Sequence, residues 1–200
     1  MDALARQEAT QGTKRFTYSD YAEWEDDNRW ELIDGVPRMM ASPQIPHQDV
    51  LLELGIQFRS FLRGKKCKVL IAPCDVRLNN KTRDNIVVQP DLIVVCDREK
   101  LEDGKSVKGA PDLVVEILSP STSKHDKITK FKLYKQAGVR EYWIVDPVDK
   151  IVSVYVFEEG QLGMFNYDET EKIPVHVLEG CEIDLSTIFD EDEIEEEATA

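Results

Sequence analysis

The chain has 200 residues, of which 42% are hydrophobic and 32% charged, which is typical of a globular protein that can bury a sizeable core. It contains no apolar run long enough to cross a membrane, and residues 1–14 are polar, so we expect a cytoplasmic protein without a membrane partner. The formal net charge of −14 argues against loose, nonspecific adhesion to nucleic acid.

The charge is unevenly distributed along the chain. Seven acidic residues fall between Asp190 and Glu197, and we expect residues 190–200 to form an acidic, disordered tail. Residues 1–15 are expected to be a frayed leader, which leaves 16–189 as one domain. Basic residues gather at 59–68 and 124–135, so a local positive surface is compatible with an acidic protein. The four cysteines, Cys67, Cys74, Cys96 and Cys181, lack the spacing of a metal site or a redox pair. Three of the four lie in apolar, strand-like surroundings, where we expect reduced, buried thiols.

The first half of the chain contains three predicted elements. A short helix is expected at 17–26, capped by Thr17 or Ser19. Residues 30–40 predict a hairpin, because Asp34-Gly35 is a strong turn signal. Residues 47–63 show the apolar stripe of an amphipathic helix, which Gly64 ends.

The second half alternates between strands and helix. Strands are expected at 68–78, 86–96 and 111–118, and the runs 92–95 and 113–115 are apolar on both faces, as in central strands. A helix at 124–137, a strand at 141–146 and a hairpin at 151–167 follow, with a short element at 183–189.

Two carboxylates interrupt strands that should otherwise be buried. Asp91 precedes the apolar run 92–95, and Glu116 lies inside the strand 111–118. An ionised carboxylate in such a place is costly unless it is paired or binds a metal ion. If the strands are neighbours, both side chains can face one side of the sheet and bind a hard cation such as Mg²⁺. The alternative is a pair of structural carboxylates that accept hydrogen bonds from the backbone or from arginine.

Lys130 occupies an unusual place in the predicted helix 124–137. With about 100° between successive residues, it lies in the middle of the apolar arc, which consists of Phe131, Leu133, Tyr134 and Ala137. A lysine directed at the sheet beside Glu116 suggests a cation near a phosphate or a metal-bound water. The alternative is an amine that reaches solvent past the helix edge, or one that pairs with Asp126.

These residues also carry a family resemblance. Pro90-Asp91 followed by Glu116 resembles the PD-(D/E)XK nuclease superfamily, and a longer series of motifs resembles the Uma-type family of restriction-endonuclease-like proteins. The motifs are WELIDG at 30–35, His47, PDLVVEILSPST at 111–122, Asp126, Lys130, Tyr134 and GVREYW at 138–143. The likeness covers residues 16–158. It implies an α/β restriction-endonuclease-like core of helix, three strands, helix and strand, with an N-terminal helix–hairpin and a C-terminal hairpin added, a Mg²⁺-type site and a nucleic-acid substrate.

The chain departs from the superfamily pattern at Leu118, where a lysine is expected. Residues two apart on a strand face the same side, so Leu118 leaves the place of the cation beside Glu116 empty. We expect Lys130 to fill this place from the following helix. Asp91 and Glu116 are then the predicted ligands of Mg²⁺ or Mn²⁺, with Lys130 near the scissile phosphate.

Two further residues are weaker candidates for the site. Glu31, in the predicted hairpin, is expected to assist the metal or the water, and the alternative is a glutamate that faces solvent. His47 opens the apolar stripe of its helix. It is a candidate donor to a metal ligand or a substrate contact, although a hydrogen-bonded core histidine is the commoner outcome.

The sequence therefore predicts a metal-dependent endonuclease that hydrolyses phosphodiester bonds of nucleic acid, with DNA the favoured substrate. The hydrolysis is expected to use water directly, because no serine, cysteine or histidine arrangement indicates a covalent nucleophile. One alternative is an inactive module of the same fold that binds nucleic acid or regulates a partner, which the acidic charge and Leu118 favour. Another is an interaction protein that forms a homodimer through the hairpin 151–167.

Overall fold

The computed structural model describes residues 14–119, 125–158 and 160–189. The expected leader, apart from its last residues, and the expected tail lie outside these ranges. The helices are α2 (Tyr18–Tyr21), α3 (Ile45–Leu62) and α4 (Phe131–Ala137), with 3₁₀ turns at Arg98–Leu101 and Leu185–Thr187 and a π-helix at His125–Lys130. The strands are β1 (Trp30–Ile33), β2 (Val36–Met39), β3 (Lys68–Ile71), β4 (Val76–Arg77), β5 (Val87–Val88), β6 (Leu92–Val95), β7 (Val107–Lys108), β8 (Leu113–Ile117), β9 (Glu141–Asp146), β10 (Ile151–Glu158), β11 (Gln161–Asp168), β12 (Lys172–Pro174) and β13 (Glu182–Asp184).

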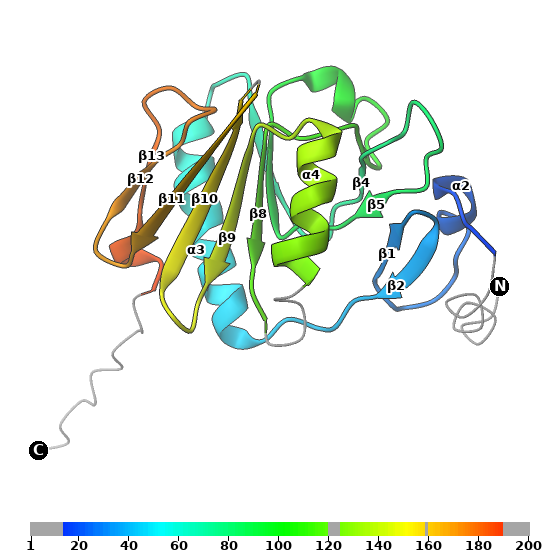
Figure 1. Cartoon of the computed structure of the whole chain (residues 1–200), viewed down its shortest axis with the longest axis horizontal. Coiled ribbons are helices and arrows are strands. Elements are labelled where there is room, and N and C mark those ends of the chain that lie inside the picture. The colour runs from blue at the N-terminus through cyan, green and yellow to red at the C-terminus, as the bar shows by residue number, and fades with distance from the viewer. Residues whose placement is uncertain (1–13, 120–124, 159, 190–200) are drawn as a thin grey trace, which may run out of the picture.

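A six-stranded sheet in the order β11-β10-β9-β8-β6-β3 forms the centre of the protein. Among the described strands of this sheet, β8 and β9 are the pair that runs parallel, and α4 lies in the connection between them, as is common in a parallel crossover. α3 and α4 lie on opposite faces of the sheet (Figure 1). The order α3, three strands, α4, β9 confirms the predicted α/β core.

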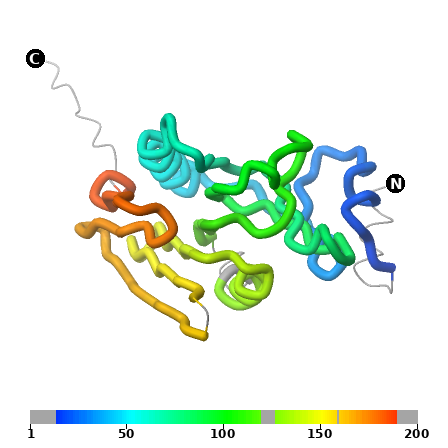
Figure 2. Tube along the Cα trace, turned by 90° about the horizontal axis from the view of Figure 1, so that it is seen from above, coloured from blue at the N-terminus to red at the C-terminus, as the bar shows by residue number. Residues whose placement is uncertain are grey.

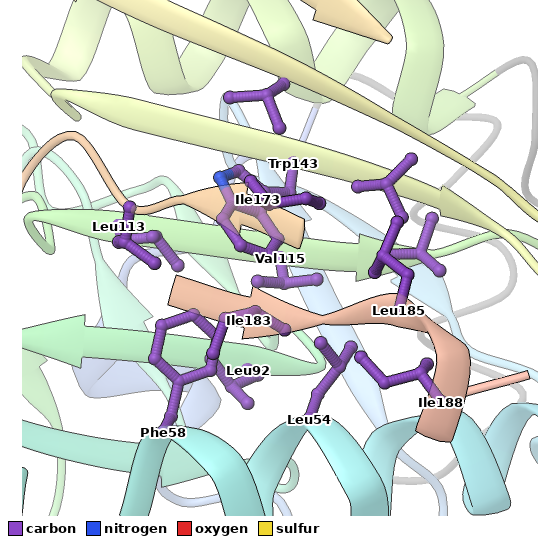
Figure 3. Packing of buried hydrophobic residues seen from close by; sticks show 14 of the residues in the cluster. Leu54, Phe58, Leu92, Leu113, Val115, Trp143, Ile173, Ile183, Leu185 and Ile188 are labelled. Carbon is purple, nitrogen blue, oxygen red and sulfur yellow. The ribbon is translucent and has the colours of Figure 1, made fainter. Parts of the chain in front are cut away.

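Strand periodicity divides the apolar residues between the two faces. Leu113 and Val115 of β8 pack on the side of α3, together with Leu54 and Phe58 of that helix and with the strands β12 and β13 (Figure 3). Val114 belongs to the cluster on the side of α4. Glu116, two positions after Val114, therefore belongs to the α4 side of the strand.

A second sheet, in the order β2-β1-β5-β4-β7, joins the N-terminal hairpin to the centre. The prediction of unbroken strands at 68–78 and 86–96 was wrong, because each is divided into two short strands. Pro73 and Pro90 stand in the two breaks, and proline has no N–H to donate to a ladder. The chain thus passes from the second sheet to the central sheet across residues 89–91. Seen from above in Figure 2, the N-terminal segment lies at one end of the molecule and β11 to β13 at the other.

Several element boundaries follow from local sequence signals. Thr17 and Asp20 form a capping box at α2, although the helix is shorter than the predicted 17–26. Asp34 and Gly35 both have positive φ, as the turn of a tight hairpin requires. The predicted helix 124–137 is a π-helix followed by α4, and it ends at Gly138 in the left-handed region.

The expectation of reduced cysteines was wrong for one pair. Cys67 precedes β3 and Cys96 follows β6, and the two form a disulfide. Their juxtaposition follows from the register of β3 against β6, in which Lys68 faces Val95. Cys74 and Cys181 are free, and burial raises the pKa of each thiol to about 11. None of the helices within the described ranges is long and apolar enough to cross a membrane.

Candidate active site

A pocket of about 160 Å³ brings together all five side chains that the sequence predicts for the site. Its walls include Asp91 and Glu116 from the central sheet, Glu31 from β1, His47 from the first turn of α3 and Lys130 from the end of the π-helix. These residues are up to 99 positions apart, from 31 to 130, and only the fold makes them neighbours.

Glu116 is held from the α4 side by two donors. The Lys130 amine lies 2.9 Å from Glu116 Oε1, and the Tyr134 hydroxyl donates to the same oxygen at 2.5 Å. Glu116 and Lys130 are each only 3% exposed. The alternative in which the Lys130 amine reaches solvent is therefore excluded. The amine lies beside Glu116, as we expected, although Lys130 belongs to a π-helix rather than to an α-helix.

Glu31 makes the second ion pair of Lys130. Its Oε1 lies 3.0 Å from the Lys130 amine and also accepts a hydrogen bond of 3.0 Å from the backbone N–H of Gln89. Glu31 is 2% exposed, so the alternative in which it faces solvent does not hold. One ammonium thus lies between two buried carboxylates, so replacing Lys130 would take its positive charge away from both of them.

Asp91 immediately precedes β6, the strand next to the one that carries Glu116. The ladder between β6 and β8 pairs Leu92 with Val115, and continuing this register by one position sets Asp91 opposite Glu116. Asp91 Oδ2 accepts a hydrogen bond of 2.8 Å from the Ile117 N–H and lies 3.2 Å from His47 Nε2. Within the described residues its Oδ1 accepts no hydrogen bond.

His47 is oriented by Asp91 and completes that side of the pocket. Its Nε2 is directed at the carboxylate, while its Nδ1 is buried without a hydrogen-bond partner in the described part of the chain. The residue therefore contacts the predicted metal ligand, and its burial is equally compatible with a hydrogen-bonded core histidine.

Tyr134 is a site residue that the helical pattern concealed, because an aromatic residue on an apolar arc is usually part of the core. It does pack in the core against Tyr142, but its hydroxyl reaches Glu116. Burial, with the nearby carboxylates of Glu116 and Glu31, raises its pKa well above 10. The hydroxyl therefore stays protonated and donates at any ordinary pH.

The donor set of the pocket suits a hard divalent cation. Asp91 and Glu116 contribute carboxylate oxygens from adjacent strands, and Mg²⁺ takes one or two carboxylates and keeps several waters. The residues that the structure describes contain no group of three or more His, Cys, Asp or Glu side chains arranged to hold a metal ion. A cation here would therefore take its remaining ligands from water or substrate.

Comparisons with known proteins identify the family and the fold of the chain. The chain is 29% identical over 160 residues to an uncharacterised protein of Synechocystis sp., covering 77% of this chain and 81% of the relative. Its fold matches the crystal structure of "a putative nuclease belonging to DUF820" from Anabaena variabilis with a TM-score of 0.70 and 19% identity, over 87% of this chain and 97% of that one. The model of the Uma2 family, described as "Putative restriction endonuclease", matches residues 18–186. The chain therefore belongs to the Uma2 family of nuclease-like proteins.

Proposed function

We propose that this protein is a cytoplasmic Mg²⁺- or Mn²⁺-dependent endonuclease that hydrolyses phosphodiester bonds of DNA. One observation carries the proposal: a carboxylate on β8, a second one at the start of the adjacent strand β6 and a buried lysine line the same pocket. Family membership supports a nuclease-like function, and the restriction-endonuclease description of the family favours DNA. The choice of metal rests on the chemistry of these side chains.

Asp91 and Glu116 are the residues that would hold the cation. When bound, such a cation polarises a phosphate oxygen and lowers the pKa of a bound water. Glu116 is presented for this task by Tyr134, and Asp91 by the Ile117 N–H and His47.

Lys130 supplies a positive charge on the pocket wall, where charge develops on a scissile phosphate. Glu31 fixes the amine by its ion pair and is itself anchored to the backbone at Gln89. Glu31 is therefore better explained as the residue that positions Lys130, and assistance to a metal or a water comes second. Burial of the amine also limits its hydration, which strengthens its interaction with an anion.

A second candidate function is a module that binds nucleic acid without cleaving it. The observation in its favour is that Lys130 already contacts two carboxylates, so the amine is stabilised without any substrate. In addition, Leu118, at the position of the superfamily lysine, packs in the core on the α4 side.

A cleavage assay on supercoiled plasmid separates the two candidates. We expect nicking that requires Mg²⁺ or Mn²⁺ and that is lost in Asp91→Asn and in Glu116→Gln, with Asp49→Asn, an exposed carboxylate on α3, as the matched control. A parallel reaction with RNA of the same sequence tests the preference for DNA. Binding without cleavage would favour the inactive module, and cleavage that survives both variants would refute the proposed site.

A further inference from the structure

One face of the β1–β2 hairpin presents two arginines to the pocket. Arg29 precedes Glu31 by two positions, so both side chains lie on the same face of the extended chain. Arg38 of β2 is the cross-strand partner of Glu31, and directly opposed residues also share a face. Since Glu31 reaches Lys130, this face is the one directed at the site, and Arg29 and Arg38 both line the pocket.

Arg29 is held in one orientation but is incompletely satisfied. Its Nε donates to Gln89 Oε1 at 2.9 Å, and Gln89 is itself fixed by Asp75 and Tyr21 through contacts of 2.9 and 3.1 Å. Arg29 Nη2 is buried and has no hydrogen-bond partner within the described residues. A buried, charged donor without an acceptor costs free energy, so the site gains stability when an acceptor enters beside it.

Arg38 lies at the exposed mouth of the same pocket. No ion pair of Arg38 or of Arg29 with a carboxylate is formed among the residues that the structure describes. Lys130, by contrast, is shared between Glu31 and Glu116. The two guanidinium groups are therefore the cations of the pocket whose charge is not matched by a carboxylate partner.

We infer that Arg29 and Arg38 bind a phosphate group of the nucleic-acid backbone beside the scissile phosphodiester. A planar guanidinium presents paired N–H donors that match phosphate oxygens, which suits arginine better than lysine for this task. The inference rests on the proposed function for the class of substrate. It assigns a role to the N-terminal hairpin, which holds the strand while the central sheet carries the reacting groups.

The test is the affinity for a short fluorescein-labelled DNA duplex, measured by anisotropy over a salt series with Ca²⁺ in place of Mg²⁺. We expect Arg38→Met and Arg29→Met each to weaken binding about tenfold, the value of one charged hydrogen-bonded contact. Each should also make the negative slope of log association constant against log salt concentration less steep by about one. Arg29→Lys should recover the slope but only part of the affinity.

Arg83→Met, an exposed arginine that does not line the pocket, is the matched control and should bind as wild type does. Arg38 is exposed, so its variant tests the inference even if Arg29→Met folds poorly. Wild-type affinity and slope in Arg38→Met and in a folded Arg29→Met would overturn the inference, and so would a wild-type protein that does not bind the duplex. Binding that depends on both arginines without plasmid nicking would refute the endonuclease and leave the phosphate site standing. Plasmid nicking together with duplex binding that neither arginine variant weakens would support the endonuclease and refute the phosphate site.

Discussion

The Lys130 amine lies 2.9 Å from Glu116 Oε1, although the two residues come from a helix and a strand 14 positions apart. In the superfamily pattern the lysine would stand on the strand itself, where this chain has Leu118. Here the ammonium group of Lys130 comes from the π-helix that precedes α4. It is buried together with its two partners, Glu31 and Glu116. The pair therefore contributes both to the chemistry that we propose and to the stability of the core.

Replacing Lys130 by methionine is expected to affect cleavage and folding together. Cleavage should fall on the order of 100-fold, as for the loss of one charge partner of a transition state. Stability should fall by about 3–5 kcal/mol, because two buried carboxylates lose their counter-charge. Packing of the helix alone predicts an intact fold for Lys130→Ala, but the ion pairs with Glu31 and Glu116 change this expectation.

The control for this experiment is Lys132→Met, an exposed lysine of α4 that should change neither quantity. Adding Glu31→Gln to Lys130→Met should restore part of the stability in urea unfolding without restoring cleavage. A Lys130→Met protein that cleaves at the wild-type rate would remove Lys130 from the catalytic centre.

Divalent cations are expected to stabilise the fold through Asp91 and Glu116. A ligand that binds only the native state adds about 1.4 kcal/mol when its free concentration is ten times Kd. Mg²⁺ or Mn²⁺ should therefore raise Tm in calorimetry, and the double variant Asp91→Asn/Glu116→Gln should show no such rise. The same cation response in the double variant would place the metal elsewhere.

Tyr134→Phe is expected to cost about 1–3 kcal/mol near pH 7, because the buried Glu116 loses a donor. The effect should depend on pH. The pKa of Tyr134 is raised above 10 in the folded protein, so above pH 10 the unfolded chain releases a proton that the folded chain keeps. Wild type then loses stability as pH rises, and its advantage over Tyr134→Phe should shrink between pH 10 and 11. Urea unfolding at pH 7, 10 and 11 gives the comparison, and a constant difference would contradict it.

The disulfide between Cys67 and Cys96 closes a loop over a sequence separation of 29. Constraint of the unfolded chain by a loop of this size is worth about 3–4 kcal/mol. Dithiothreitol should lower the Tm of wild type, but not that of a Cys67→Ala/Cys96→Ala protein, and Cys74→Ala serves as the control. Peptide mapping without reductant that finds free thiols at 67 and 96 would contradict this pairing.

A homodimer is expected to form through the free edge of β11. Residues 161–167 are uncharged, and Leu162, Met164 and Phe165 are exposed. Two copies of a protein with a net charge of −14 repel each other least where the surface is neutral. Met164→Lys should shift sedimentation towards the monomer, while Leu52→Lys on α3 should not. A monomeric wild type would exclude this assembly.

The parts of the site that follow a local period could be predicted from the sequence. Glu116 interrupts an apolar strand and Lys130 an apolar helical arc, and each anomaly marks a group that needs a partner. The prediction that Asp91 lies near Glu116 required the assumption that strands β6 and β8 are adjacent. The structure confirms that assumption.

What could not be predicted depends on contacts between distant segments. Arg29 and Arg38 look like ordinary surface arginines until the register of the hairpin and its docking are known. The Cys67–Cys96 pair likewise requires the antiparallel register of β3 against β6. For Tyr134 the reason is different. Its ring packs in the core, as the helical pattern predicts, while its hydroxyl donates to Glu116, which the pattern does not indicate.

The contact between Glu31 and the N–H of Gln89 also has a dynamic consequence. This amide lies where the chain crosses between the two sheets, and its acceptor comes from the N-terminal hairpin. Its hydrogen can exchange with solvent only when this hydrogen bond opens, and a movement that withdraws Glu31 Oε1 also breaks its ion pair with Lys130. The exchange rate of this single amide therefore sets an upper limit on how often Glu31 leaves the active centre in the native protein, independently of any substrate.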